Sequence, residues 1–202
     1  MKQISPRVIL LAIMTLFVLP LALAWILYTN PFRGQMNNSG NLGRLVLPIV
    51  PLQWTGASIV APSNAHQTLE GFWVIIYILP PHCEEPCLKQ VAELRQLHRA
   101  TGRNRDRVKI VLLSEPAFDP LLRHDLLSLY SGFNLASLPS AEFAGSLRQA
   151  DHNSSLQDSA AVFYLVDPLG NIMMTYSGDE GPGKMSKDLK TLLTWSKLDE
   201  RI

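Results

Sequence analysis

The apolar residues downstream of residue 70 form several short, almost unbroken runs. Three of these runs, Phe72 to Leu79, Val108 to Leu113 and Ala161 to Val166, are rich in Val, Ile, Leu and aromatic residues. Runs of this length are typical of strands buried on both faces of a sheet. A fourth run, Ile172 to Tyr176, follows an Asp-Pro-Leu-Gly-Asn turn at 167–171. It is therefore predicted to return as the hairpin partner of the third strand.

Apolar residues at helical spacing lie between and after these strands. Leu88, Val91, Leu94 and Leu97 recur every three or four residues, which predicts a helix after the first strand. Further helices are predicted over 120–130, 141–148 and 185–198, and the rest of 131–158 is irregular. The first helix and its two flanking strands form a β-α-β unit, in which the strands are parallel. The order β-α-β-α, then β-β-α, predicts a thioredoxin-like α/β domain with a central mixed sheet flanked by helices.

The N-terminal region has a different pattern. Val8 to Tyr28 is a run of 21 residues without a charge, which is enough to cross a bilayer as one transmembrane helix. Lys2 and Arg7 precede the run, so the positive-inside rule places the N-terminus in the cytoplasm. The rest of the chain would then lie on the exported side of the inner membrane, the periplasm in a bacterium. A cleaved signal peptide is the alternative, because the Ala-Leu-Ala at 22–24 resembles a signal peptidase site.

These patterns divide the chain into three parts. Residues 1–28 are predicted to form a cytoplasmic N-terminus and a membrane anchor, 29–55 a linker rich in Asn, Gly and Pro, and 56–202 the thioredoxin-like domain. Within the linker, Leu45 to Ile49 can form an edge strand or lie against the domain. The formal net charge of +1 implies no broad electrostatic attraction to nucleic acid.

The two cysteines, Cys83 and Cys87, lie between the first strand and its helix. Thiols near a helix N-terminus are stabilised as thiolates by the helix dipole, although Glu84 and Glu85 between them oppose this. Residues at i and i+4 can share one helical face, so the pair can close as a disulfide or hold Cu(I). Two cysteines are too few for a disulfide-stapled scaffold, and their close spacing indicates one redox or metal site. A structural disulfide remains the alternative, although a loop this small stabilises little.

Two histidines are candidates for a further metal ligand. His82 directly precedes Cys83, and it can complete a site or point into solvent. His152 lies in the irregular segment and can act as a substitute ligand or as a surface residue. Imidazole and thiolate together are typical ligands of copper.

The thiol segment resembles that of the Sco/SenC family of membrane-anchored, thioredoxin-fold assembly factors. In that family a Cys-x-x-x-Cys motif preceded by His directly follows the first central strand, as in the His-Cys-Glu-Glu-Pro-Cys sequence at 82–87. The family's later strand and Asp-Pro-x-Gly turn are matched by Phe163 to Gly170. The N-terminal anchor and linker also fit. The resemblance implies copper delivery to, or thiol reduction of, the dinuclear copper site of cytochrome c oxidase.

The sequence departs from the family at three points. The third copper ligand of the family is a His in an Asp-His pair before the later strand, and here the pair is Asp158-Ser159. A Ser hydroxyl is a poor replacement for imidazole at copper. No Pro occurs at 157–161, where thioredoxins place a cis-Pro, and Leu88 stands where the family has Pro.

The sequence therefore predicts a membrane-tethered factor that assists respiratory oxidase assembly through Cys83 and Cys87. The chemistry would be thiol-disulfide exchange, transient Cu(I) binding or both, and the expected partner is an oxidase subunit or another thiol or copper protein. The alternative is a non-catalytic binding or scaffold module with a structural disulfide. A peroxiredoxin-like peroxidase is disfavoured, because the chain has no Thr-x-x-Cys arrangement.

Overall fold

The computed structural model describes residues 5–29, 40–52, 58–61, 69–114, 118–137, 141–153, 162–178 and 181–196. The chain divides into two compact units, Met1–Asn41 and Leu42–Ile202. In the first unit, Pro6–Thr29 forms the helix α1, in agreement with the helix predicted over 8–28. Within the described parts of the chain, no helix has the length and hydropathy needed to cross a membrane.

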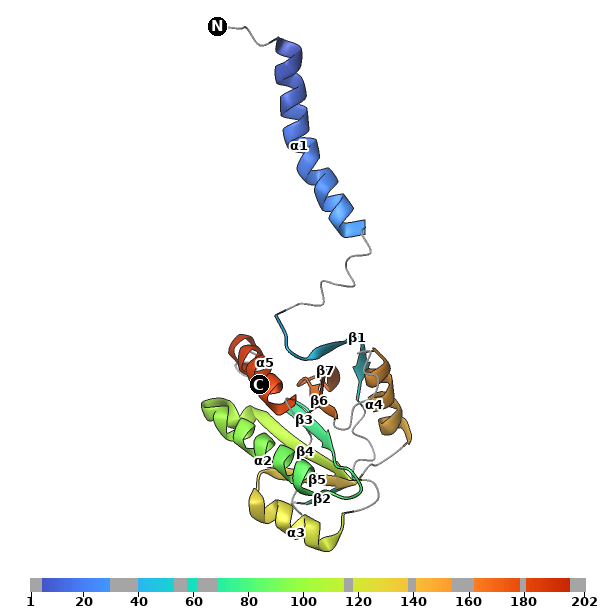
Figure 1. Ribbon diagram of the computed structural model, residues 1–202, viewed down its shortest axis with the longest axis vertical. Helices are drawn as coiled ribbons and strands as arrows, with labels where there is room; N and C mark the ends of the chain where they lie inside the picture. The colour runs from blue at the N-terminus through green and yellow to red at the C-terminus, as the bar shows by residue number, and fades with distance from the viewer. Residues whose placement is uncertain are drawn as a thin grey trace. The chain divides into compact units, whose positions relative to one another are not determined.

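The second unit is built on one seven-stranded sheet with the order β1-β7-β6-β3-β4-β5-β2 (Figure 1). Its strands are β1 (Arg44–Pro51), β2 (Ser58–Ala61), β3 (Trp73–Ile78), β4 (Val108–Ser114), β5 (Phe133–Ser137), β6 (Val162–Val166) and β7 (Asn171–Ser177). The pairs β3–β4 and β4–β5 are parallel, and the other pairs are antiparallel. The predicted mixed sheet, the parallel β-α-β unit and the β6–β7 hairpin are all confirmed.

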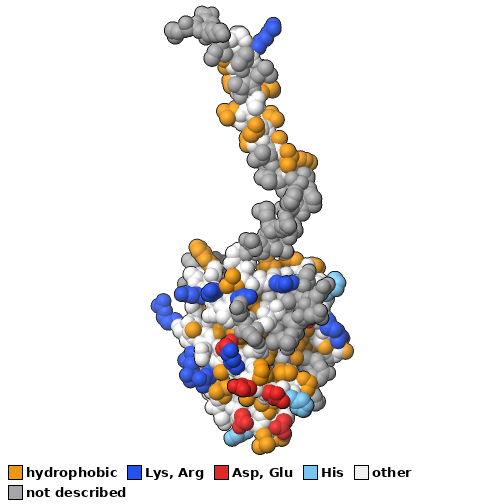
Figure 2. Space-filling view, in the orientation of Figure 1, with side chains coloured by type: hydrophobic (Ala, Val, Ile, Leu, Met, Phe, Trp, Pro, Cys, Tyr) orange, Lys and Arg blue, Asp and Glu red, His pale blue; other side chains and the backbone are white. Residues whose placement is uncertain are grey.

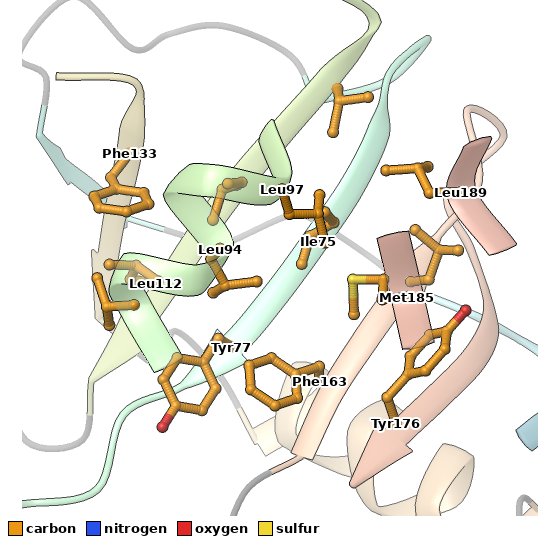
Figure 3. Close-up of a cluster of buried hydrophobic side chains, with 14 of the residues drawn as sticks. Ile75, Tyr77, Leu94, Leu97, Leu112, Phe133, Phe163, Tyr176, Met185 and Leu189 are labelled. Atoms are coloured by element: carbon orange, nitrogen blue, oxygen red, sulfur yellow. The ribbon is translucent and has the colours of Figure 1, made fainter. Parts of the chain in front are cut away.

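The helices of this unit are α2 (Glu85–Ala100), the 3-10 helix η2 (Gly102–Arg107), α3 (Pro120–Leu129), α4 (Ala141–Asn153) and α5 (Gly181–Trp195). They cover both faces of the sheet. Successive side chains of a strand point to opposite faces, so the apolar strands present a surface to be buried on each side. Ile75 and Tyr77 of β3 enter the core that contains Leu94 of α2, Leu126 of α3 and Met185 of α5, part of which Figure 3 shows.

The opposite face of the sheet is covered by α4. Val74 and Ile76 of β3 enter a second core, where they meet Phe143, Leu147 and Ala150 of α4. We call the face under α2, α3 and α5 the disulfide face and the other the α4 face. In Figure 1, α4 lies on one side of the sheet and α2 and α3 lie on the other.

The beginning of the domain differs from the prediction. The predicted linker, 29–55, contains β1, which pairs antiparallel with β7 and buries Val46 and Val50 at 1% exposure each. Of the two alternatives for Leu45 to Ile49, the edge strand is the observed one. The compact unit accordingly begins at Leu42, upstream of the predicted boundary at residue 56. Pro48 and Pro51 made the segment resemble a linker, but an edge strand tolerates Pro because one side of it needs no ladder hydrogen bonds.

A buried carboxylate holds the start of β1. Asp188 of α5 is 5% exposed and accepts hydrogen bonds from the backbone N–H groups of Leu42, at 2.9 Å, and Gly43, at 2.8 Å. The Tyr176 hydroxyl also donates to Asp188, at 3.0 Å. Burial, followed by the nearby carboxylate, raises the pKa of Tyr176, so this hydroxyl stays a donor. A Cβ at Gly43 would lie 2.5 Å from the Tyr176 ring, so no side chain fits there unless the ring moves.

The region before the third predicted strand also differs. The sequence predicted no strand between residues 131 and 158, whereas Phe133–Ser137 forms β5, which pairs with both β4 and β2. The helix predicted over 141–148 extends to Asn153. Asn134 made β5 look irregular, but its side chain donates to the Ile110 carbonyl at 3.1 Å, which satisfies the buried amide.

Candidate redox and metal centre

The candidate site forms where β3 ends and α2 begins. The Leu79 N–H donates to the Leu113 carbonyl at 2.7 Å, which continues the ladder with β4 by one residue. Pro80 and Pro81, which lack N–H donors, then turn the chain away from the sheet. α2 starts at Glu85, with Glu84 as its N-cap residue and Pro in its first turn, a position that Pro tolerates. The predicted sequence of strand, turn and helix is therefore the observed one.

Cys83 and Cys87 form a disulfide across this turn, with their Cα atoms 5.1 Å apart. Cys83 lies before the helix, whereas Cys87 lies in its first turn. Cys87 is only 5% exposed and belongs to the core of the disulfide face. Cys83 is half-buried and packs against that core from outside. The two cysteines are therefore not equivalent, because Cys83 is the more accessible to another molecule.

A buried polar pair lies close to the disulfide in the fold. Gln90 follows Cys87 by three residues, so the two share one side of α2. The Tyr77 hydroxyl, from the end of β3, donates to the Gln90 side-chain oxygen. Burial raises the pKa of Tyr77 to about 12, so the hydroxyl remains protonated at neutral pH. Its ring stacks on Phe163 of β6, with the centroids 4.6 Å apart (Figure 3).

The sequence pattern does not reveal the role of this pair. Tyr77 lies within the apolar run Phe72 to Leu79, and neither residue is among the candidate site residues that the sequence indicates. The available signal was Gln90 itself, a polar residue between Cys87 and Val91 on the apolar side of a helix. Such a residue needs a buried hydrogen-bond partner, and Tyr77 on the preceding strand supplies it.

The two candidate histidines do not join the cysteines. His82 is exposed although it is next to Cys83 in the chain, and His152 is exposed in the last turn of α4. α4 covers the opposite face of the sheet from the disulfide. Among the described residues, no three His, Cys, Asp or Glu side chains are grouped closely enough to hold a metal ion. Ser159, at the position of the family's ligand, lies outside the described residues.

The donors available here favour one kind of metal. When reduced, Cys83 and Cys87 supply two soft thiolates on one turn of backbone, and these suit Cu(I) much better than Cu(II). The carboxylates of Glu84 and Glu85 are exposed to solvent between them. The arrangement can therefore exchange disulfides or hold a soft monovalent ion.

The order of the strands, the helices on both faces and the cysteine pair at the start of α2 define a thioredoxin-like protein. Residues 73–196 match the family model described as the transmembrane-like, thioredoxin-like, C-terminal domain, and the chain belongs to that family. No curated protein matches the chain significantly.

Solved structures with a similar fold include Sco proteins, as the resemblance predicted. The apo Sco1 protein of Thermus thermophilus has a TM-score of 0.53 and 17% identity, with 75% of this chain and 96% of that chain covered. A SCO1/SenC family lipoprotein of Bacillus anthracis has a TM-score of 0.50 and 17% identity, with 74% and 97% covered. A thioredoxin family thiol:disulfide interchange protein of Chlorobium tepidum has a TM-score of 0.51 and 11% identity, with 72% and 97% covered. At these identities the likeness shows the thioredoxin-like fold.

Proposed function

We propose that this chain is a membrane-tethered thioredoxin-like factor that assists respiratory oxidase assembly by thiol-disulfide exchange at Cys83 and Cys87. The observation that carries the proposal is the asymmetry of the disulfide, with Cys83 half-buried before the helix and Cys87 5% exposed within it. An accessible sulfur joined to a protected one suits an attack-and-resolve sequence. The Sco-like thiol motif, and the likeness to Sco and interchange proteins, support the choice of substrate class.

In the oxidising direction, a partner thiolate attacks the Cys83 sulfur. A new disulfide forms between the partner and Cys83, the bond to Cys87 breaks, and Cys87 leaves as a thiolate. A second partner thiol, once deprotonated, attacks the partner sulfur of the mixed disulfide and releases Cys83. The partner has then lost two electrons, and this chain holds them as a dithiol. In the reducing direction the same steps run backwards, with Cys83 attacking a partner disulfide and Cys87 resolving it.

Single-cysteine variants of the full-length chain test this assignment. Cys87→Ser leaves the accessible Cys83, which should form a mixed disulfide with glutathione disulfide. Cys83→Ser leaves the buried Cys87, which should react roughly tenfold or more slowly, because thiol exchange depends on access. Equal rates for the two folded variants, or no reaction at Cys83, would contradict the proposal.

Cu(I) handling by the reduced pair is the second part of the proposal. It rests on the donor set, because reduction of the disulfide would leave two soft sulfur ligands on one turn of the chain, and the described residues offer no third ligand beside them. The reduced chain should bind about one Cu(I) per cysteine pair and bind Cu(II) poorly. Ser159→His should strengthen copper binding by restoring the family's ligand. Tight Cu(II) binding by the wild type that is lost in His152→Ala would overturn this part.

We also propose that Val8 to Tyr28 anchors the chain in the inner membrane as a single-pass segment. The uncharged run and the preceding Lys2 and Arg7 support an N-terminus in the cytoplasm and a thioredoxin-like domain in the periplasm. The residues between this run and Leu42 would then serve as the tether. Protease added to spheroplasts should digest the domain. A mature chain that starts near Trp25 and is released by osmotic shock would contradict the anchor.

A non-catalytic scaffold remains the second candidate function. It is favoured by the packing of Cys87 into the core, where a disulfide can be inert. The reduction potential separates the two functions, because structural disulfides are more difficult to reduce than exchanging ones.

A further inference from the structure

A groove of about 750 Å³ runs between α2 and α5 on the disulfide face. Leu97 and Ala100 line it from α2, and Pro182 and Lys187 line it from α5. Leu42, 47% exposed at the start of the domain, adds an apolar side chain to one end. The groove therefore lies between two helices that are about 15 residues long.

Two smaller hollows extend this groove along α2. One of about 350 Å³ shares Leu97, Ala100 and Ser186 with it and reaches the ends of both helices. Another of about 250 Å³ shares Glu93 with it and reaches Pro86, the residue directly before Cys87. Neighbouring hollows share lining residues, and together they extend along α2 from Pro86 to its C-terminal end. We call this surface the α2–α5 groove.

The α2–α5 groove has an apolar floor, lysines along its α5 side, and Glu85 and Glu93 on its α2 side. Leu97, Leu189 and Leu193, between 1% and 5% exposed, form the floor where α2 and α5 meet the core. On the α5 side, Lys187 and Lys190 are exposed at a spacing of three residues, which places them along one side of the helix. Figure 2 shows Lys and Arg side chains gathered over α5, whereas most of the visible Asp and Glu side chains lie nearer the start of α2.

The polar groups near the groove do not suit a small ligand. Small-molecule sites usually combine apolar walls with a few convergent polar groups. Here the floor is apolar, and the charged lining residues, among them Glu93, Lys187 and Lys190, are half-buried or exposed. A long apolar groove between two helices is instead the shape that binds an amphipathic helix.

We propose that the α2–α5 groove binds an amphipathic helix of a partner protein, with acidic side chains on the flank of its apolar stripe that faces α5. The apolar stripe would cover Leu97, Leu189 and Leu193, and the acidic side chains would face Lys187 and Lys190. Because the groove reaches Pro86, a partner held here has its neighbouring segments close to the disulfide. The groove itself contains neither cysteine, so this binding goes beyond the exchange chemistry and does not depend on it.

Two designed peptides test the proposal against the full-length chain. Each has about 18 residues, or roughly 27 Å as a helix, with Leu at positions i, i+3, i+4 and i+7. One carries Glu along one flank of the Leu stripe, and the other carries Lys at the same positions. The Glu peptide should bind in fluorescence titration, and the Lys peptide should bind roughly tenfold more weakly because like charges meet at the rim.

Variants of the chain locate the binding. Lys187→Glu reverses a rim charge, and Ala100→Trp fills the groove. Each variant should weaken binding of the Glu peptide roughly tenfold. Arg148→Glu is the matched control, because Arg148 is exposed on α4 at the opposite face. The double variant Cys83→Ser, Cys87→Ser should bind like the wild type, even if the proposed exchange chemistry fails. No binding of the Glu peptide, equal binding of both peptides, or an equal effect of Arg148→Glu would overturn the proposal.

Discussion

The two faces of the sheet are built from the same strands but carry different features. On the disulfide face lie the cysteine pair, the buried Tyr77–Gln90 hydrogen bond and the α2–α5 groove. The described part of the α4 face has no cysteine, and its polar pair, Tyr164 with Asp151, ties α4 to β6 at 2.9 Å. The comparison shows that burial alone does not make a site. The candidate chemistry lies where a buried strand ends and a helix begins with two thiols.

The largest expected effect comes from removing β1, which mainly supports the α4 face. A chain that starts at Trp54 loses buried Val46, Val50 and Leu52, and leaves Asp188 without its two backbone donors. Burial of each apolar side chain is worth about 1.5–3 kcal/mol, so the total approaches the stability of a whole domain. We expect no cooperative thermal unfolding. A chain that starts at Gly40 is the control and should unfold cooperatively. Cooperative unfolding of both fragments would mean that β1 is dispensable.

A matched pair of phenylalanines tests whether the faces differ in stability or only in chemistry. Phe163 on the disulfide face and Phe143 on the α4 face are both fully buried. Phe163→Ala and Phe143→Ala should each cost about 3–5 kcal/mol in urea unfolding. Only Phe163→Ala should also change the equilibrium of the disulfide with glutathione, because Phe163 stacks on Tyr77. Equal redox changes in both variants would remove the distinction between the faces.

A matched pair of tyrosines sharpens the comparison with a smaller change. Tyr77→Phe removes the donor to Gln90, and Tyr164→Phe removes the donor to Asp151. Each should cost about 1–2 kcal/mol, as expected for the loss of one buried hydrogen bond. We expect Tyr77→Phe alone to change the reactivity of Cys83 in the single-cysteine background Cys87→Ser. Unchanged reactivity would limit the Tyr77–Gln90 pair to a structural role.

The smallest effects are the pH dependences, which have opposite signs on the two faces. His98 lies under the disulfide face, bonded to Tyr130 and the Val108 carbonyl, and burial lowers its pKa from 6.5. The unfolded chain then binds more protons below pH 6.5, so stability falls as the pH decreases from there towards the folded-state pKa.

Asp151 on the α4 face behaves in the opposite way. Burial raises its pKa above 3.8, although the hydrogen bond from Tyr164 partly offsets this. The folded chain then binds more protons than the unfolded chain above pH 3.8. The contribution of Asp151 to the free energy of unfolding therefore decreases as the pH rises through the folded-state pKa. The free energy of unfolding can be measured in urea from about pH 4 to about pH 7. His98→Gln should remove the increase of stability with pH that His98 causes, and Asp151→Asn should remove the decrease that Asp151 causes. Unchanged slopes would show that other groups dominate.

The disulfide face was the better predicted of the two. The elements next to the disulfide, α2 and the shared strands β3 and β4, have clear apolar patterns, and the cysteines directly mark the junction between β3 and α2. The α4 face depends on β1, whose prolines make its sequence resemble a linker. β5 contains Asn134, which is compatible with burial only because its side chain donates a hydrogen bond to the Ile110 carbonyl. Such elements are stabilised by contacts between distant parts of the chain, which local patterns do not contain. For the same reason the Tyr77–Gln90 pair was missed, and the placement of His152 on the opposite face could not be predicted.

The reduction potential of the Cys83–Cys87 disulfide tests the central claim most directly. The full-length chain would be equilibrated with glutathione buffers, and the fraction of dithiol measured by thiol labelling. A pair that exchanges disulfides should have a potential between about −270 and −120 mV, the range of known exchange proteins. A potential below about −300 mV, typical of structural disulfides, would contradict the exchange function and favour the scaffold.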